Sequence, residues 1–178
     1  MAVLPIRTFG DPVLRQRARD ADGVTEMHRR LARDMLETMR EAPGVGLAGP
    51  QVGVLERIFV WEVDERHGVV INPVITSRSR DTVEGEEGCL SLPGLYYPVE
   101  RSTAVVVQGL DEQGDRVRLE ADDLLARVCQ HEIDHLDGVL FIDHLPEELR
   151  REALERLRNE ALGLPSAPAA RPPVQDTL

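Results

Sequence analysis

One five-residue segment in the last third of the chain, His131-Glu132-Ile133-Asp134-His135, limits most strongly what this sequence can fold into. In an α-helix, residues four positions apart share a face, so both imidazoles could bind one metal ion. The same segment carries an apolar stripe, formed by Val128, Ile133, Leu136 and Val139. We expect the helix to run from Asp122 or Asp123 to about residue 137, where Gly138 would end it. The apolar stripe indicates that this helix packs into the protein.

The other segments predict an α+β fold. Apolar residues at every fourth position predict an amphipathic helix over residues 24–42, with a core stripe of Met27, Leu31, Met35 and Met39. Runs rich in β-branched residues predict strands at 57–63, 69–75, 103–110 and 116–119. The glycine-rich stretch 43–53 is expected to be a loop, and residues 146–162 a further helix. Strands that follow one another without intervening helices indicate α+β and not an alternating βαβ pattern.

Composition narrows the class of protein. The chain has 178 residues, the size of one domain, and we expect residues 1–163 to form it. The proline-rich tail, residues 164–178, is expected to be disordered. A net charge of −11 and an aromatic content of 3% disfavour DNA or another polyanion as partner. The absence of a signal peptide and of a long apolar run, together with only two cysteines, indicates a cytoplasmic protein without a membrane span.

A catalytic metal site needs a third protein ligand and one open position. Asp143 and His144 follow the helix closely, whereas Cys89 lies upstream in the segment 86–91. A thiolate is a strong ligand for zinc or ferrous iron. Glu132, next to the first histidine, could act as general base on a metal-activated water. Taken alone, the residues also fit two surface histidines on an acidic helix and a small buried cysteine.

The glycine-rich stretch has its own functional interpretation. It lacks the Gly-Lys-Ser/Thr end of a Walker loop and fits no dinucleotide fingerprint. Its glycines would let a substrate approach the backbone. Gln51 supplies a neutral amide donor, which could stabilise an oxyanion near a metal. The simpler interpretation is a flexible connection.

Three ordered segments together resemble the peptide deformylase family. Residues 44–51 match Gly-apolar-Gly-apolar-Ala-Ala-x-Gln, except that Gly49 replaces the second alanine. Residues 87–91 match Glu-Gly-Cys-apolar-Ser in full, and residues 130–135 match Gln-His-Glu-x-Asp-His in full. The early segment Ile6-x-x-x-Gly10-x-Pro12-x-Leu14 agrees as well, so the resemblance extends over about residues 6–145.

The resemblance implies hydrolysis of the N-formyl group from the initiator methionine of new polypeptides. It implies that mixed, mostly antiparallel strands surround a central metal-binding helix, whose ion is held by Cys89, His131 and His135. The expected ion is ferrous iron, with zinc, nickel or cobalt able to replace it. Glu132 matches the catalytic residue, while Gln51 and the backbone N–H of Leu90 match the oxyanion donors.

Further positions follow from the same resemblance. Glu87 and Arg101 match an ion pair that would fix the loop carrying Cys89. The N-formylmethionyl peptide would contact residues along the cleft and its side-chain pocket, namely Gly44, Val45, Gly46, Gly94, Leu95, Tyr96, Tyr97, Val128 and His131. The C-terminal helix resembles one that docks on the ribosome in a branch of the family, through arginines corresponding to Arg150, Arg151, Arg156 and Arg158. Five glutamates on this helix favour an ordinary solvated helix instead.

Two other functions share parts of the pattern. A zinc peptidase would use the same histidines and glutamate on a peptide bond. A non-enzymatic protein would close the metal site with a fourth ligand, Cys129 or His144. We interpret Cys129 as structural, because two positions before His131 it should point away from the ligand face. The single departure from the motifs, Gly49, predicts a less rigid loop with activity retained.

Overall fold

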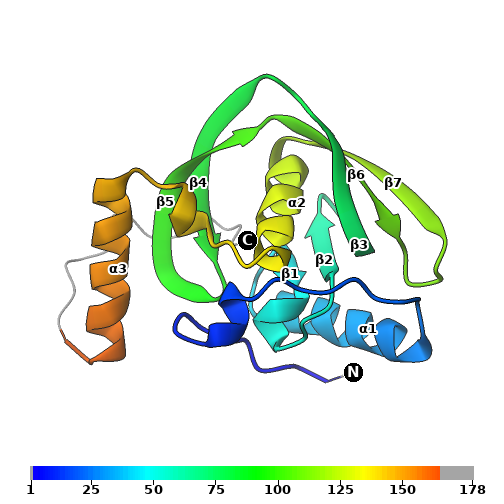
Figure 1. Cartoon of the computed structure of the whole chain (residues 1–178), viewed down its shortest axis with the longest axis horizontal. Helices are drawn as coiled ribbons and strands as arrows, with labels where there is room; N and C mark the ends of the chain where they lie inside the picture. The colour runs from blue at the N-terminus through cyan, green and yellow to red at the C-terminus, as the bar shows by residue number, and fades with distance from the viewer. Residues whose placement is uncertain (1, 165–178) are drawn as a thin grey trace.

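The computed structural model describes residues 2–164, which form an α+β fold (Figure 1). Its helices are α1 (Glu26–Glu41), α2 (Asp123–Leu136) and α3 (Glu147–Ala161), with short 3-10 helices η1 (Pro12–Arg15), η2 (Gly49–Val52) and η3 (Phe141–His144). Its strands are β1 (Gly46–Ala48), β2 (Ile58–Val63), β3 (Arg66–Arg78), β4 (Thr82–Cys89), β5 (Leu92–Ser102), β6 (Ala104–Leu110) and β7 (Arg116–Asp122).

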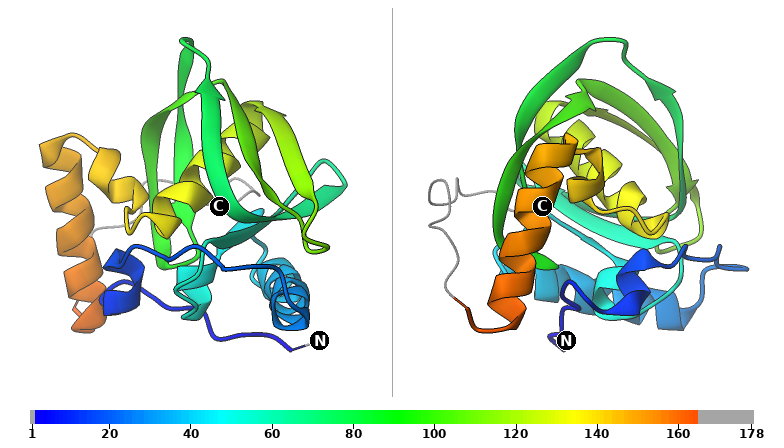
Figure 2. Two further views of the ribbon diagram at one scale, coloured as in Figure 1. Left: turned by 45° about the vertical axis from the view of Figure 1, so that its right-hand side comes forward. Right: turned by 60° about the vertical axis from the view of Figure 1, so that its left-hand side comes forward.

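Antiparallel pairing organises these strands into two sheets. One sheet has the order β1-β2-β3-β6-β7, and β4 and β5 form a separate hairpin. The hairpin lies between α2 and α3, and α3 stands at the edge of the molecule (Figures 1 and 2). The predicted α+β class with mostly antiparallel strands and three helices is confirmed.

Strand β2 shows how the core is divided, because both of its faces are buried. Ile58 and Val60 pack in the cluster that contains Met35 and Met39 of α1. The alternate residues of β2 pack in a second cluster with the apolar side of α2. Helices α1 and α2 therefore cover opposite faces of the five-stranded sheet. The methionine stripe is confirmed as core at its two later positions, whereas Met27 is 68% exposed.

Helix α2 is buried along most of its length. Val128 and Ile133 join the cluster under the five-stranded sheet, while the face with the histidines turns toward the β4–β5 hairpin. The helix ends at Leu136, and Gly138 follows with φ +75°. A Cβ at Gly138 would lie 2.8 Å from the backbone oxygen of Arg15. The predicted glycine stop is therefore confirmed, on both backbone conformation and space.

The sequence does not predict the β4–β5 hairpin, and this omission is corrected by the structure. Strand β4 contains two glycines, Gly85 and Gly88, and exposes Glu84 and Glu86, a composition with low β propensity. It forms because β5 pairs along its length. The prediction of a loop over residues 43–53 is also wrong in part, since β1 pairs with β2 and η2 follows directly.

The structure gives a packing reason for the departure from the motif at Gly49. The residue is buried, and its carbonyl accepts a hydrogen bond from the Val54 N–H at 2.9 Å. A Cβ on Gly49 would lie 2.8 Å from the backbone oxygens of both Val54 and Glu56. The space that a methyl group would need is therefore filled by backbone atoms.

We expect Gly49→Ala to destabilise the protein by about 1–3 kcal/mol, because an added methyl overpacks this site. Urea denaturation would measure the loss. Gly23→Ala is the matched control, since no heavy atom lies within 4 Å of a Cβ at Gly23. Equal stability of the Gly49 variant and the wild type would contradict the expectation. The folded fraction should keep the hydrolytic activity that the resemblance implies.

The predicted disordered tail, residues 164–178, lies outside the described residues apart from Leu164. None of the helices within residues 2–164 combines the length and apolar character that crossing a bilayer requires.

Candidate metal centre

Three buried side chains from two elements converge in the interior. His131 and His135 come from successive turns of α2, and Cys89 from the end of β4. The Nε2 atoms of the two histidines lie 3.2 Å apart, and the Cys89 Sγ lies 3.2 Å from the His135 Nε2. The potential ligand atoms of all three lie within 4.8 Å of one another. This set of one sulfur and two imidazole nitrogens suits zinc or ferrous iron.

The surroundings of these residues match what a metal ligand requires. Burial lowers the pKa of His135 well below its usual value, which keeps the imidazole neutral. Burial raises the pKa of the Cys89 thiol in the metal-free protein, and a bound cation would reverse this by favouring the thiolate. The Nδ1 atom of His131 donates to the Glu87 carboxylate at 3.0 Å, so its Nε2 lone pair is directed at the other two residues.

The other ligand candidates lie elsewhere. Cys129 is buried in the apolar cluster between α2 and the sheet, where burial raises the pKa of its thiol to about 12. Asp143 pairs with Arg15 and Arg150. His144 contacts Asp134 at 2.7 Å. Within residues 2–164, none of the three belongs to a cluster that could hold a metal ion.

Glu132 is fully buried beside these ligands. Among residues 2–164, neither of its carboxylate oxygens has a hydrogen-bond partner. Burial, and then the charges of Glu87 and Asp134, raises the pKa of Glu132 well above its usual value. A divalent cation nearby would favour the carboxylate form, since an opposite charge lowers the pKa of an acid. The unpartnered carboxylate therefore fits a site that binds a cation and a water.

Gly46 of β1 provides the space for this carboxylate. A Cβ on Gly46 would lie 2.9 Å from the Glu132 Cδ and would overlap its Oε1. The strand edge and the acid are thus in direct contact, which only a glycine allows.

Gln51 faces the same centre with its amide oriented by the backbone. Its Oε1 accepts from the Ala48 N–H at 2.7 Å, which leaves the NH₂ group directed at the Cys89 Sγ, 3.7 Å away. Leu90, half-buried, lies in the two-residue turn that follows Cys89 between β4 and β5. An amide donor thus borders the ligand cluster, and Leu90 directly follows one of its members.

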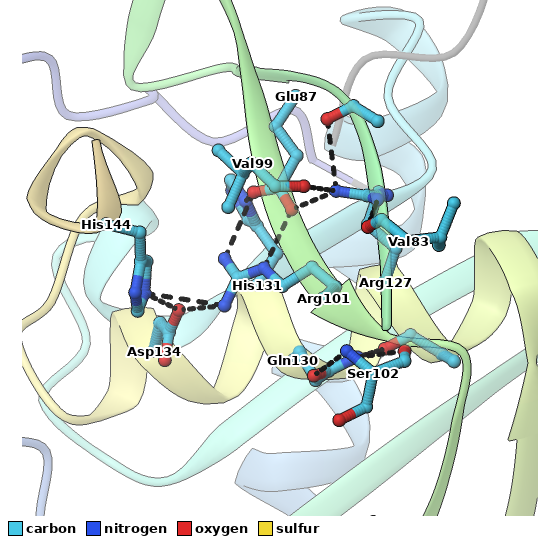
Figure 3. A network of polar contacts seen from close by, with 12 residues as sticks. Val83, Glu87, Val99, Arg101, Ser102, Arg127, Gln130, His131, Asp134 and His144 are labelled. Carbon is cyan, nitrogen blue, oxygen red and sulfur yellow. Dashed lines mark hydrogen bonds and ion pairs between the residues drawn. The ribbon is translucent and has the colours of Figure 1, made fainter. Parts of the chain in front are cut away.

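Glu87 organises a buried network behind the ligands (Figure 3). Its oxygens accept from Arg101 at 2.8 and 3.1 Å and from His131. Arg101 also donates to Asp134 at 2.7 Å. Burial by itself would raise the pKa of Glu87, but hydrogen bonds from His131 and Arg101 bring it well below its usual range. The ion pair that the resemblance implies is therefore formed, and it is buried.

We expect Glu87→Gln to destabilise the metal-free protein by about 3–5 kcal/mol at pH 7, because it removes a buried carboxylate that neutralises buried guanidinium groups. The pKa of Glu87 is lowered on folding, so its contribution is complete above the unfolded value and is lost as pH falls below about 4.3. Urea denaturation at pH 7 and pH 4 would show a smaller difference at the lower pH.

Glu62→Gln is the control for this prediction. Glu62 pairs with Arg40 at 2.6 Å, but both side chains are partly exposed, and such pairs contribute about 0–1 kcal/mol. A Glu87 variant no less stable than the Glu62 variant would contradict a structural role for the buried network.

Two polar residues of α2 make contacts that the sequence does not predict. Gln130 exchanges hydrogen bonds with the backbone of Ser102, at 3.2 and 3.0 Å. Arg127 donates to Glu87 at 2.8 Å and to carbonyls of the hairpin. The one sequence signal for Arg127 is its position four residues before His131, on the same helix face.

The residues expected to contact substrate fall into two groups. Gly46, Val45 and Gly44 lie on or next to β1, beside Glu132, and Val128 is buried in the cluster against which Val45 packs. Leu95 is instead buried in the cluster shared with α3, and the Gly94 carbonyl accepts from Arg156 of α3 at 3.5 Å.

The ring of Tyr96 on β5 explains why residue 88 is a glycine. A Cβ on Gly88 would lie 2.8 Å from the Cδ1 of Tyr96, so this glycine makes room for an aromatic ring. Tyr97 is buried, and its hydroxyl donates to Glu152 of α3 at 3.0 Å.

Known proteins share both the sequence and the fold. The family model described as polypeptide deformylase matches residues 3–151. The chain is 52% identical over 158 residues to a peptide deformylase of Acidothermus cellulolyticus, covering 89% of this chain and 87% of that protein. It is 50% identical over 175 residues to a peptide deformylase of Thermus thermophilus, covering 89% and 90%.

Solved structures agree with this similarity. The crystal structure of peptide deformylase from Ehrlichia chaffeensis matches with a TM-score of 0.87 at 36% identity, covering 91% of this chain and 98% of that one. The same enzyme in complex with actinonin also matches with a TM-score of 0.87, at 38% identity, covering 90% and 98%. The match of sequence over most of the chain, together with this fold, shows that the chain belongs to the peptide deformylase family.

Proposed function

We propose that this chain cleaves the formamide bond of N-formylmethionyl peptides at the cluster of Cys89, His131, His135 and Glu132. Peptide deformylases are metal-dependent hydrolases that remove the N-formyl group from newly synthesised polypeptides, and the chain is a member of that family. The observation that carries the assignment to this cluster is the buried, unpartnered carboxylate of Glu132 beside three converging ligand atoms.

The proposed metal ligands are Cys89, His131 and His135, on the central helix and the adjoining hairpin. A divalent ion held by these residues would supply Lewis acidity and lower the pKa of a water at the site. Ferrous iron is the proposed native ion, with zinc, nickel or cobalt as substitutes, since thiolate and imidazole suit all of them. Three protein ligands leave a position open for chemistry, whereas a structural site would be closed by a fourth.

Glu132 is the proposed general base and acid. Its carboxylate takes the proton of the attacking water and later delivers a proton to the leaving amine nitrogen, which frees the methionine amino group and formate. The carboxylate supports this role because, in the part of the chain that the structure describes, neither of its oxygens is engaged in a hydrogen bond.

The proposed oxyanion donors are the Gln51 amide and the Leu90 N–H. The hydrogen bond from Ala48 fixes the amide of Gln51 before substrate arrives, so no reorganisation is needed as charge develops on the formyl oxygen. Glu87 and Arg101 are proposed to hold His131 and the end of β4 in position.

Substrate contacts are proposed along β1 and the start of β5. Gly44, Val45 and Gly46 would pair with the peptide backbone, and Val128 would contact the methionine side chain. Gly94, Leu95 and Tyr96 would flank the cleft. Residues 1–163 are proposed as one catalytic domain. Its substrate is the nascent chain, which supports a cytoplasmic location and makes ribosome contact through α3 a further proposal.

The test is formate release from formyl-Met-Ala by anaerobically purified protein, with unformylated Met-Ala as the matched substrate. We expect formate from the first peptide and no dipeptide cleavage of either. Chelation of the metal should abolish formate release, and ferrous iron should restore it. Cleavage of Met-Ala would identify a peptidase. A bound metal with four protein ligands and no activity would identify a structural site.

A further inference from the structure

Within residues 2–164, every side-chain hydrogen bond of Arg127 on α2 goes to the β4–β5 hairpin. The side chain is buried one helical turn before His131. Its Nη1 and Nη2 groups reach acceptors on both strands, which are the carbonyls of Val99 (2.9 Å), Gly85 (3.2 Å) and Val83 (3.1 Å) and the Oε1 of Glu87 (2.8 Å) (Figure 3). One guanidinium therefore joins α2 to both strands of the β4–β5 hairpin, which is separate from the five-stranded sheet that α2 covers.

The spacing of these residues couples the arginine to the metal centre. Arg127, His131 and His135 follow one another at intervals of four and share a face of α2. Glu87 bridges the first two, since its Oε1 accepts from Arg127 and its Oε2 from His131. Cys89 follows Glu87 by two residues on the same strand. The distance between the thiol and the imidazoles thus depends on how β4 rests on α2.

We propose that Arg127 is a positioning residue that holds the β4–β5 hairpin on α2, so that Cys89 stays within reach of His131 and His135. This role rests on the proposed ligand set. A guanidinium suits it because its planar array of donors is rigid and remains charged. Gly85 is shaped to receive it, since a Cβ there would lie 2.7 Å from the Arg127 Nη2.

The first test compares metal binding by the whole protein and by Arg127→Gln, with cobalt(II) as the probe. We expect about 10–100-fold weaker cobalt binding in competition with a chelator. The thiolate-to-cobalt charge-transfer absorption, which reports the bond from Cys89, should weaken as well. Arg127→Lys should restore part of the affinity, because it keeps the charge but not the fork.

Arg57→Gln is the matched control. Arg57 also connects the end of α2 to a strand, donating to the Leu136 carbonyl at 3.4 Å, to Asp137 at 2.7 Å and to the Pro73 carbonyl at 3.4 Å, but its hydrogen bonds within residues 2–164 reach no residue of the hairpin. We expect this variant to lose stability without losing cobalt affinity. If both variants lose the same affinity, general destabilisation explains the effect and the positioning role is overturned.

A second variant keeps Arg127 but fills the space beside its guanidinium. Gly85→Ala should displace the guanidinium from its acceptors and weaken cobalt binding in the same direction. Because both changes act on one contact, Gly85→Ala combined with Arg127→Gln should be no weaker than Arg127→Gln alone. Additive losses would contradict the proposal.

Two failures are distinguishable. A wild-type protein that shows no thiolate-to-cobalt absorption would overturn the proposed ligand set, and the positioning role with it. A wild-type protein with that absorption, and an Arg127→Gln variant with unchanged affinity and absorption, would overturn the role of Arg127 alone.

Discussion

Replacing Glu132 with Gln is expected to lower kcat/KM for formyl-Met-Ala by about 10²–10⁴-fold, the range typical of a lost general base. The amide has nearly the same shape as the carboxylate, but it cannot accept the proton of the attacking water. Since Glu132 is not among the three converging ligand residues, metal binding should persist. Formate release by anaerobically purified protein would measure the rate, and elemental analysis the metal content.

Equal rates in wild type and Glu132→Gln would refute this mechanism. Loss of metal from the variant would show that Glu132 supports the ion instead of moving protons. The matched control is Glu62→Gln, the same chemical change in a partly exposed ion pair on β2, which should leave the rate unchanged.

Gly46→Ala is expected to lower kcat/KM by about 10²-fold, because the new methyl group occupies the space of the Glu132 carboxylate. A Cβ at this position would overlap Oε1, so the acid must move by an amount comparable to an ångström. A misplacement of that size at a reacting centre can cost about 10²-fold in rate. The steady-state parameters for formyl-Met-Ala would measure the loss.

Gly23→Ala provides the control, since a Cβ there meets no heavy atom within 4 Å. Combining Gly46→Ala with Glu132→Gln tests the reason for the effect. If the methyl group acts by displacing the acid, the double variant should be no slower than Glu132→Gln. Fully additive losses would mean that Gly46 acts through substrate pairing and not through Glu132.

Much of the architecture could be predicted from local patterns. Helix α2 was within reach because histidine spacing, an apolar stripe and the glycine stop at Gly138 all point to the same boundaries. Strand β2 could be predicted from its short apolar run, which fits the burial of both of its faces. The β4–β5 hairpin could not be predicted in this way. Gly85, Gly88 and the charged Glu87 lower the strand propensity of β4, and Arg127, which anchors the hairpin on α2, lies about 40 residues further along the chain.

The residues of the site divide in the same way. Cys89, Glu132 and the two histidines carry chemistry in their side chains, so their types and their order along the chain could indicate a metal site from sequence alone. Arginine is usually found at the protein surface, so the sequence does not mark Arg127. Its side chain is buried and hydrogen-bonded only because β4 and β5 pack on α2. In the sequence, Gly49 is simply an alanine of the motif that lacks its methyl group. In the structure, the Val54 and Glu56 carbonyls fill the space that this methyl group would need.

The sequence by itself determined the family, the α+β class, the identity of the metal-ligand candidates and the helix that carries two of them, because helical periodicity and side-chain chemistry are properties of neighbouring residues. Only the tertiary structure decided that the ligand atoms of Cys89 and the two histidines lie within 4.8 Å of one another, that Glu132 is buried against Gly46 with no hydrogen-bond partner among residues 2–164, and that Glu87 joins Arg127 to His131. These contacts link segments about 40 or more residues apart. They arise when the two sheets close on α2, and no local pattern encodes that geometry.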